Sequence, residues 1–136
     1  MSAFVHHRTL LETFIKAVDA FNNQDFKVLQ GLLHPHAVLN RIHNRKHTDT
    51  VRGRAQVIKH LTNKLKADMT QFTPIDPISV GIRTGTVSGT GEWEDPKGAK
   101  PEKISYSFIF TQDTDTHEWS LLNMDALALR REGDNA

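Results

Sequence analysis

Hydrophobic residues recur at helical spacing in the first half of the chain and at alternate positions in the second half. Residues 9–22 form one apolar helical face: Leu11, Phe14, Ile15, Val18 and Phe21. Asp25 suits the N-cap of a second, shorter helix, and Pro35 is expected to end it because the residue before a proline avoids the helical region. Gly53 precedes a third helix with Ile58, Leu61 and Leu65 on its buried side.

Strands are predicted between the second and third helices and throughout the second half. The first strand covers residues 37–42, and a turn leads into a short partner at 50–52. Four further strands are expected at 78–83, 84–94, 103–112 and 118–129, separated by turn-rich segments. Helices followed by a run of hairpins predict an α+β domain, with the helices packed on one face of a mostly antiparallel sheet.

Composition narrows the class of protein without selecting a function. The 136 residues suit one domain spanning 1–136, with 130–136 as a frayed polar tail. The chain has no cysteine, which excludes a disulfide scaffold, a thiolate metal site and a cysteine nucleophile. The N-terminal residues lack the pattern of a signal peptide, and no apolar run is long enough to span a membrane. We therefore expect a cytoplasmic protein with no membrane partner.

Basic residues are concentrated in one segment. Residues 34–66 hold eight Lys or Arg side chains against Asp49 as the only acid. Two interpretations remain open: a solvated helix face balanced by acids elsewhere, or a surface that faces an anionic ligand. We expect no nucleic-acid partner, because the segment has no binding motif and no interleaved aromatic residues.

The same segment contains four of the eight histidines, and their spacing raises the possibility of a metal site. His34 and His36 flank Pro35 at a helix end, whereas His43 and His47 straddle a predicted turn. No carboxylate lies beside either pair in the sequence, apart from Asp49 near His47. We expect no metal and no cofactor.

Three segments resemble the NTF2-like superfamily, also called SnoaL-like. FIKAVDAFNNQDFKVLQGLLHPHAV looks like the two opening helices and first strand of that family, and VRGRAQVIKHL looks like its third helix with the preceding glycine. VSGTGEW, ISYSFIFTQ and EWSLLNMDA look like its long paired strands. The resemblance implies a cone, in which a strongly curved sheet wraps around three helices and encloses a pocket. The family includes isomerases, dehydratases, cyclases, hydrolases and members without catalysis, so the fold does not fix the function.

Alternation along the strands predicts which side chains line the interior of such a cone. On residues 103–110, Tyr106 and Phe108 share the apolar face, so both should point inward. On residues 86–93 the inward set contains Trp93 and two glycines, Gly89 and Gly91. The glycines either leave room for a ligand or only permit curvature of the sheet.

The last strand is assigned from the resemblance, since the family points a tryptophan at this position into the cone. If Trp119 points inward, alternation along the strand places Leu121, Asn123 and Asp125 on the same inward face. Leu122 and Met124 would form an apolar outer face, which suits a homodimer formed sheet against sheet. The reversed assignment would make Asp125 a surface acid.

The first strand is aligned with the family in the same way, which places Arg41 and His43 inward. The catalytic acid of the family's isomerases falls where Arg41 stands, so this chain lacks that acid. Two interpretations of the inward polar set remain open. In one, Arg41 and Asp125 form an ion pair that closes the core. In the other, Asp125 or His43 moves a proton while Tyr106 and Arg41 stabilise an oxyanion.

The sequence therefore favours a small-molecule-binding protein, acting as a cofactor-independent acid–base enzyme of the cyclase, isomerase, dehydratase or hydrolase type. The substrate would be apolar and oxygenated. The predicted catalytic residues are Asp125, His43, Tyr106 and Arg41. The predicted ligand-binding residues are Trp93, Asn123, Phe108, Leu121 and Trp119. The alternative is a non-catalytic ligand-binding or dimeric association module of the same fold.

Overall fold

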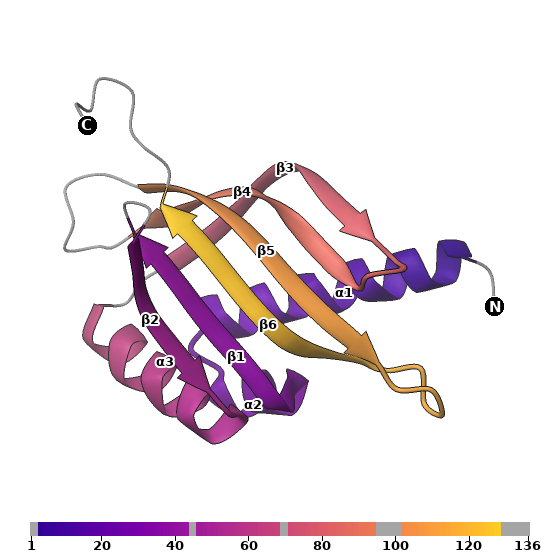
Figure 1. Cartoon of the computed structure of the whole chain (residues 1–136), viewed down its shortest axis with the longest axis horizontal. Coiled ribbons are helices and arrows are strands. Elements are labelled where there is room, and N and C mark those ends of the chain that lie inside the picture. Colours follow the sequence, from indigo (N-terminus) through magenta and orange to yellow (C-terminus); the bar gives the residue numbers. More distant parts are fainter. Residues whose placement is uncertain (1–2, 44–45, 69–70, 95–101, 129–136) are drawn as a thin grey trace.

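The computed structural model describes residues 3–43, 46–68, 71–94 and 102–128. Within these ranges it leaves the side chains of 3–5, 7, 41–43, 46–49, 64–68, 102, 127 and 128 undescribed. Three helices and six strands follow one another in the described chain (Figure 1). Their bounds are α1 Ala3–Asn22, α2 Phe26–Leu32, β1 Leu33–His43, β2 Lys46–Arg52, α3 Arg54–Asp68, β3 Gln71–Gly81, β4 Thr86–Glu94, β5 Glu102–Gln112 and β6 Trp119–Ala128.

The helices lie where the periodicity predicts them, although two of their bounds differ. α1 begins at Ala3, earlier than the predicted start at residue 9. Asp25 caps α2 as predicted, because its carboxylate accepts a hydrogen bond of 3.2 Å from the backbone N–H of Val28. Pro35 does not end α2, since the helix stops at Leu32 and the proline lies inside β1. Gly53 adopts φ +93 at the turn into α3, a conformation that favours glycine.

The strands form one open sheet in the order β2-β1-β6-β5-β4-β3. β1 and β6 pair in parallel, and every other neighbouring pair is antiparallel. β3 begins at Gln71, seven residues before the predicted start, and contains Pro74 and Pro77. A proline cannot donate to a ladder, and β3 tolerates both because it lies at an edge of the sheet. The predicted α+β fold with a mostly antiparallel sheet around three helices is confirmed.

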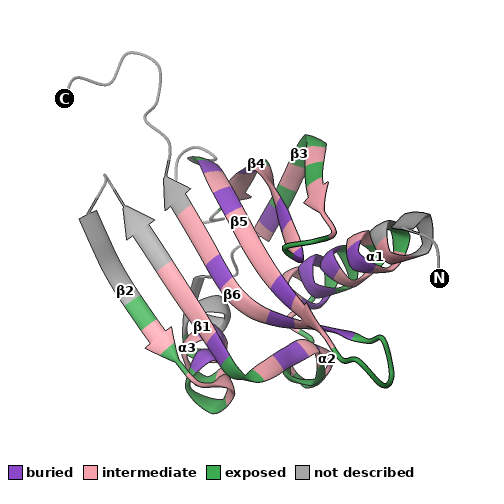
Figure 2. Cartoon of the chain, turned by 45° about the vertical axis from the view of Figure 1, so that its right-hand side comes forward, coloured by how far each residue is buried: buried purple, intermediate pink, exposed green. Residues whose placement is uncertain are grey.

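The helices cover one face of this sheet, which we call the inner face; the opposite face is the outer face. α1 crosses behind the sheet and α3 runs beside β1 and β2 (Figure 1). Buried residues recur on α1, β5 and β6 (Figure 2). The side chain of Asn22 fixes the end of α1 to β3, donating to the carbonyl of Phe72 at 2.8 Å and accepting from its N–H at 2.7 Å. This clamp holds Phe72 against the helix.

A bulge in β6 changes which of its residues face the helices. Ile109 pairs with Asn123 but Phe110 pairs with Leu121, so Leu122 is an extra residue in β6. Leu121 before the bulge and Met124 after it are both buried, three positions apart. The inward set of β6 is therefore Trp119 and Leu121, then Met124 and Ala126. The one-residue insertion reverses the face of every later residue in the strand.

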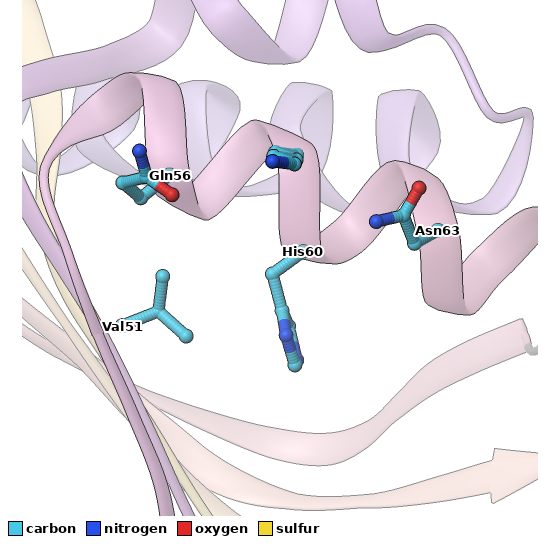
Figure 3. Close-up of a pocket in the computed structure, with 5 residues that line it drawn as sticks. Val51, Gln56, His60 and Asn63 are labelled. Atoms are coloured by element: carbon cyan, nitrogen blue, oxygen red, sulfur yellow. The ribbon is translucent and has the colours of Figure 1, made fainter.

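An open groove of about 260 Å³ lies where α3 passes the edge strand β2 (Figure 3). Val51 contributes one wall from β2. Four residues of α3 complete the lining: Gln56, Lys59, His60 and Asn63. His60 is half-buried in this groove. The groove lies at the far end of the sheet from β3.

Candidate interior site around Tyr106

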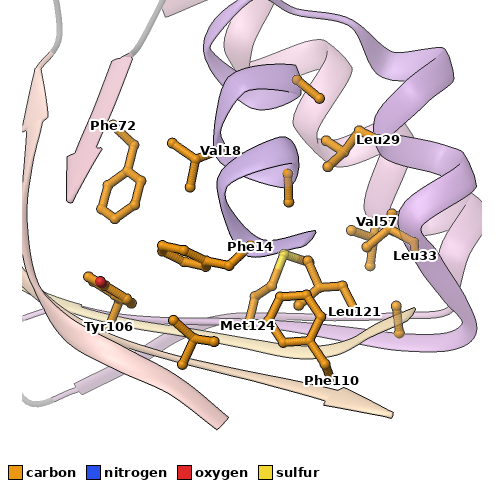
Figure 4. Packing of buried hydrophobic residues seen from close by; sticks show 14 of the residues in the cluster. Phe14, Val18, Leu29, Leu33, Val57, Phe72, Tyr106, Phe110, Leu121 and Met124 are labelled. Atoms are coloured by element: carbon orange, nitrogen blue, oxygen red, sulfur yellow. The ribbon is translucent and has the colours of Figure 1, made fainter. Parts of the chain in front are cut away.

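Tyr106 lies in the middle of β5 and points toward the helices, among aromatic rings from three elements (Figure 4). Phe14 of α1 stacks on its ring with centroids 5.5 Å apart and planes 13° apart. Phe72 of β3 meets the ring edge-on at 5.4 Å and 90°, and Phe108 packs beside it at 5.5 Å. Contacts on several sides fix the tyrosine ring in one orientation.

The hydroxyl of Tyr106 is buried and has no hydrogen-bond partner among the described residues. It points at the space left by Gly89, the residue paired with Tyr106 on β4. A Cβ added to Gly89 would lie 3.1 Å from this hydroxyl and 3.3 Å from the carbonyl oxygen of Pro77. The tyrosine hydroxyl and this carbonyl oxygen therefore occupy the space that a side chain at position 89 would need. A buried hydroxyl without a partner costs free energy, so a water or a ligand oxygen is expected to satisfy it.

Burial raises the pKa of Tyr106 above its usual value of 10.0, and the negative charge of Asp76 raises it further. The phenol is therefore neutral at physiological pH and can donate a hydrogen bond to a ligand oxygen. A neutral phenol with a raised pKa is a poor general base at this pH. The arrangement favours recognition of an oxygen atom over proton abstraction by the tyrosine.

The two inward glycines differ in what occupies the space beside them. A Cβ on Gly91 would lie 2.7 Å from a ring carbon of Phe72 and 2.9 Å from the carbonyl of Thr73. The lack of a side chain at Gly91 therefore leaves room for the ring of Phe72 to pack against the strand. Gly89 instead faces the hydroxyl of Tyr106. Neither glycine borders open space in this structure, since the hydroxyl of Tyr106 fills the room beside Gly89.

Two predicted ligand-binding residues lie on the inner face: Phe108 beside Tyr106, and Trp93 on the other side of Phe72. Phe108 packs against Phe14 at 5.5 Å, and Trp93 packs against Phe21 of α1 at 5.4 Å and against Phe72 at 6.4 Å. Both remain partly exposed although they face the helices. Solvent therefore reaches the inner face beside these rings.

Trp119 and Leu121 also face inward, as predicted, but they close the core instead of lining the region around Tyr106. The indole N–H of Trp119 donates to the hydroxyl of Thr9 on α1 at 3.1 Å. Leu121 is 1% exposed and pairs with Phe110. Both residues lie before the bulge, at the end of β6 that joins the β5–β6 turn.

The predicted inward position of Asn123 and Asp125 is wrong, because both follow the bulge and lie on the outer face. The amide of Asn40 on β1 donates to the carboxylate of Asp125 at 2.8 Å and to the side-chain oxygen of Asn123 at 3.3 Å. Thr50 of β2 donates to the side-chain oxygen of Asn40 at 3.1 Å. We call Thr50, Asn40, Asn123 and Asp125 the outer-face network. The sheet separates its carboxylate from the hydroxyl of Tyr106.

The predicted outer position of Met124 is wrong for the same reason. Met124 is buried and pairs with Phe108 on the inner face. The apolar outer strip that was expected to support a homodimer is therefore replaced by polar side chains in this part of β6.

The side chains of Arg41 and His43 lie outside the described residues, so the structure does not place these two predicted catalytic groups. Their backbones belong to β1, where Arg41 pairs with Ala126 of β6. Among the described residues, no three His, Asp or Glu side chains gather to form a metal site. His34 and His36 lie together at the start of β1, with ring centroids 5.5 Å apart. No helix in the described ranges is long and apolar enough to cross a membrane.

Two residues that shape the interior, Phe14 and Phe72, were not predicted as site residues. The sequence pattern placed Phe14 on the apolar face of the first helix, but that pattern does not show which aromatic ring contacts Tyr106. Phe72 lies before Pro74, in a segment that sequence patterns did not assign to a strand. Asn40 was also missed, because its partners on β6 were expected on the opposite face.

No protein-family model matches the chain, and no curated protein matches it. Solved structures do match. A candidate dehydratase of the NTF2-like family from Streptomyces avermitilis has a TM-score of 0.74 and 16% identity, covering 96% of this chain and 100% of that one. A candidate polyketide cyclase from Sinorhizobium meliloti has a TM-score of 0.66 and 15% identity, covering 85% and 93% of the two chains.

A third similar structure is a candidate calcium/calmodulin-dependent protein kinase II association domain from Xanthomonas campestris. It has a TM-score of 0.64 and 14% identity, covering 87% of this chain and 84% of that one. At such low identities the likeness extends to the fold alone. The three neighbours have different candidate functions on one architecture, so the function of this chain has to be argued from its own residues.

Proposed function

We propose, from the NTF2-like cone that this chain forms, that the protein binds an apolar small molecule carrying one oxygen acceptor and holds it beside Tyr106. The observation that carries the proposal is the buried, unpartnered hydroxyl of Tyr106, which lies against Gly89 because that residue has no side chain. The ligand oxygen accepts from this hydroxyl, and the apolar body of the ligand lies against Phe108 and Trp93. Aromatic walls with one placed donor are typical of small-molecule sites.

The proposed activity is binding without acid–base turnover. Asp125, the acid predicted from the sequence to move a proton, lies on the outer face, bonded to Asn40. Tyr106 remains a neutral donor at physiological pH because its pKa is raised. A donor alone can hold a carbonyl, ether or hydroxyl oxygen, but proton abstraction needs a base within hydrogen-bond reach.

The test uses 6-propionyl-2-dimethylaminonaphthalene, an apolar fluorescent ketone whose emission reports both polarity and hydrogen bonding. We expect saturable binding to the wild type with a blue-shifted emission. Tyr106→Phe keeps the ring and removes only the hydroxyl, so it should weaken binding by about two- to tenfold, the value of one neutral hydrogen bond. Asp125→Asn on the outer face is the matched control and should bind the ketone as the wild type does.

Absence of saturable binding would contradict the proposal, as would equal affinity in the wild type and Tyr106→Phe. Loss of binding in Asp125→Asn with retained folding would instead indicate that Asp125 faces the bound ketone. Far-ultraviolet circular dichroism of each variant separates loss of the site from loss of the fold.

A second candidate function is self-association through the outer face, and the outer-face network favours it. Four side chains from three neighbouring strands are held there by one another. A two-fold axis through this face would place the network of one copy against that of the other. Sedimentation equilibrium should then give a dimer that Asn40→Arg converts to a monomer, whereas Lys16→Glu on α1 leaves it intact. A wild type that is monomeric at every concentration would rule this function out.

A further inference from the structure

The groove between β2 and α3 brings four polar side chains together on one face of the helix. Its lining residues on α3 are Gln56, Lys59, His60 and Asn63. Positions three, four and seven residues apart share one face of an α-helix, so these side chains form a continuous stripe about 10 Å long. The lysine and the histidine occupy the middle of the stripe, and one amide flanks them at each end.

Val51 forms an apolar wall opposite this stripe. It points to the inner side of the sheet, because its partner Leu39 pairs in turn with Met124, which is buried. Figure 3 shows Val51 on β2 and the ring of His60 on α3 directed into the same space. The histidine is half-buried there, whereas Lys59 is exposed. The groove therefore offers a ligand one apolar wall and one polar wall.

The polar wall is positively charged. Residues 50–67 contain five Lys or Arg side chains and His60 but no Asp or Glu. The ion pair found among the described side chains joins Arg8 to Glu12 on α1, so Lys59 has no carboxylate partner among them. A lysine carries three donors on a flexible stem, which lets the ammonium of Lys59 reach an anion in the groove.

We propose that this groove binds a soluble phosphate monoester that carries a small apolar organic group. The phosphate lies between Lys59 and His60, and the amides of Gln56 and Asn63 donate to its outer oxygens. The organic group lies against Val51.

Phosphate suits this groove better than carboxylate does. A phosphate monoester carries a charge of about −1.5 to −2 at neutral pH, so it is attracted to the ammonium more strongly than a carboxylate. Its three terminal oxygens can also accept from donors spread along the stripe. The volume of about 260 Å³ is below that of a drug-sized pocket, so the organic group has to be small.

The groove is separate from the site proposed at Tyr106. Strands β1 and β6 lie between β2, which contains Val51, and β5, which contains Tyr106. A phosphate in the groove needs no contact with a ligand beside the tyrosine. Either proposal can therefore fail without the other.

The test titrates phenyl phosphate into the full chain and follows backbone amide NMR signals at low ionic strength, where screening is weak. We expect saturable shifts along the stripe, from Gln56 to Asn63. Lys59→Gln removes one exposed charge and should weaken binding by about three- to tenfold. Lys16→Gln on α1 makes the same change away from the groove and should leave the affinity within about twofold of the wild type.

Three further probes separate the parts of the ligand. Inorganic phosphate lacks the apolar group and should bind about threefold more weakly than phenyl phosphate. Phenol lacks the charge and should cause no shift in the groove. Vesicles of phosphatidylcholine with phosphatidic acid present the same phosphate as a lipid headgroup, and they should not retain the protein.

Four outcomes would overturn the proposal. The first is a titration with no saturable shift, and the second is a set of shifts confined to residues outside the groove. The third is an equal effect of Lys59→Gln and Lys16→Gln. The fourth is equal affinity for phenyl phosphate and inorganic phosphate, or binding to the vesicles in place of phenyl phosphate.

Discussion

The side-chain amide of Asn40 donates a 2.8 Å hydrogen bond to the carboxylate of Asp125 across the parallel pair β1 and β6. The amide of Asn123 lies 3.5 Å from the other oxygen of the same carboxylate. Asp125 is therefore held by two neutral amides on the outer face of the sheet. This arrangement assigns the acid a structural role at the junction of the two strands, where the sheet changes from antiparallel to parallel pairing.

The outer-face network should stabilise the fold by a modest amount. Asn40→Ala removes the donor to Asp125 and to Asn123, and we expect the free energy of unfolding to fall by about 1–2 kcal/mol, since one acceptor is charged but the site is partly exposed. Urea denaturation measures the change. Ser105→Ala on the outer face of β5 is the matched control and should change it by less than about 0.5 kcal/mol. Equal effects of the two substitutions would show that the network contributes nothing.

The interior could be predicted from the sequence up to the bulge in β6. Alternation along one uninterrupted strand placed Tyr106 and Phe108 correctly, and it placed Trp93 correctly on β4. The same rule failed for Asn123 and Asp125, because the single extra residue in β6 reverses the face of every later position. This extra residue is Leu122, and no glycine or proline in the strand indicates a bulge there. The inward direction predicted for Trp119 was right, but alternation counted from Trp119 gives the wrong face for residues beyond the bulge.

Long-range pairing explains the other differences. β3 begins before Pro74 because its edge position tolerates proline, and a sequence pattern does not show which strand will lie at an edge. The partners of Asn40 lie more than 80 residues away, on a strand whose orientation was assigned wrongly. The groove beside Val51 could not be predicted from the sequence either, since it depends on where α3 passes β2.

Tyr106 should titrate above its ordinary pKa of 10.0, because burial and the charge of Asp76 disfavour the phenolate. It is the one tyrosine in the chain, so the tyrosinate absorbance near 295 nm reports this residue alone. A group whose pKa is raised by folding contributes stability that is present below the unfolded pKa and is lost as pH rises through the folded one. The wild type should therefore lose stability above pH 10 faster than Tyr106→Phe. A titration at or below the ordinary pKa would contradict this.

Asp113 should show the opposite dependence on pH in the turn between β5 and β6. Its carboxylate accepts hydrogen bonds from the backbone N–H groups of Thr116 at 2.9 Å and Asp115 at 2.8 Å, and these bonds lower its pKa below 3.8. A pKa lowered by folding contributes stability that is present above the unfolded pKa and is lost as pH falls through the folded one. Asp113→Ala should therefore lower the melting temperature at pH 7 and have a smaller effect at pH 2. Asp115→Ala, whose side chain is exposed, is the control, and a pH-independent effect of Asp113→Ala would contradict the assignment.

Two glycine substitutions should change stability in opposite directions. Gly85 adopts φ +66 before β4, and a Cβ there would collide with the backbone carbonyl of Phe110, whose N–H already bonds to the carbonyl of Gly85 at 2.7 Å. Gly85→Ala should lower the free energy of unfolding by at least about 2 kcal/mol, because both the conformation and the space oppose a side chain. Gly31 lies within α2 with nothing within 4 Å of an added Cβ, so Gly31→Ala should raise it by about 0.5–1 kcal/mol through reduced chain entropy. Urea denaturation of the pair measures both signs, and a tolerated Gly85→Ala would show that the turn can move away from Phe110.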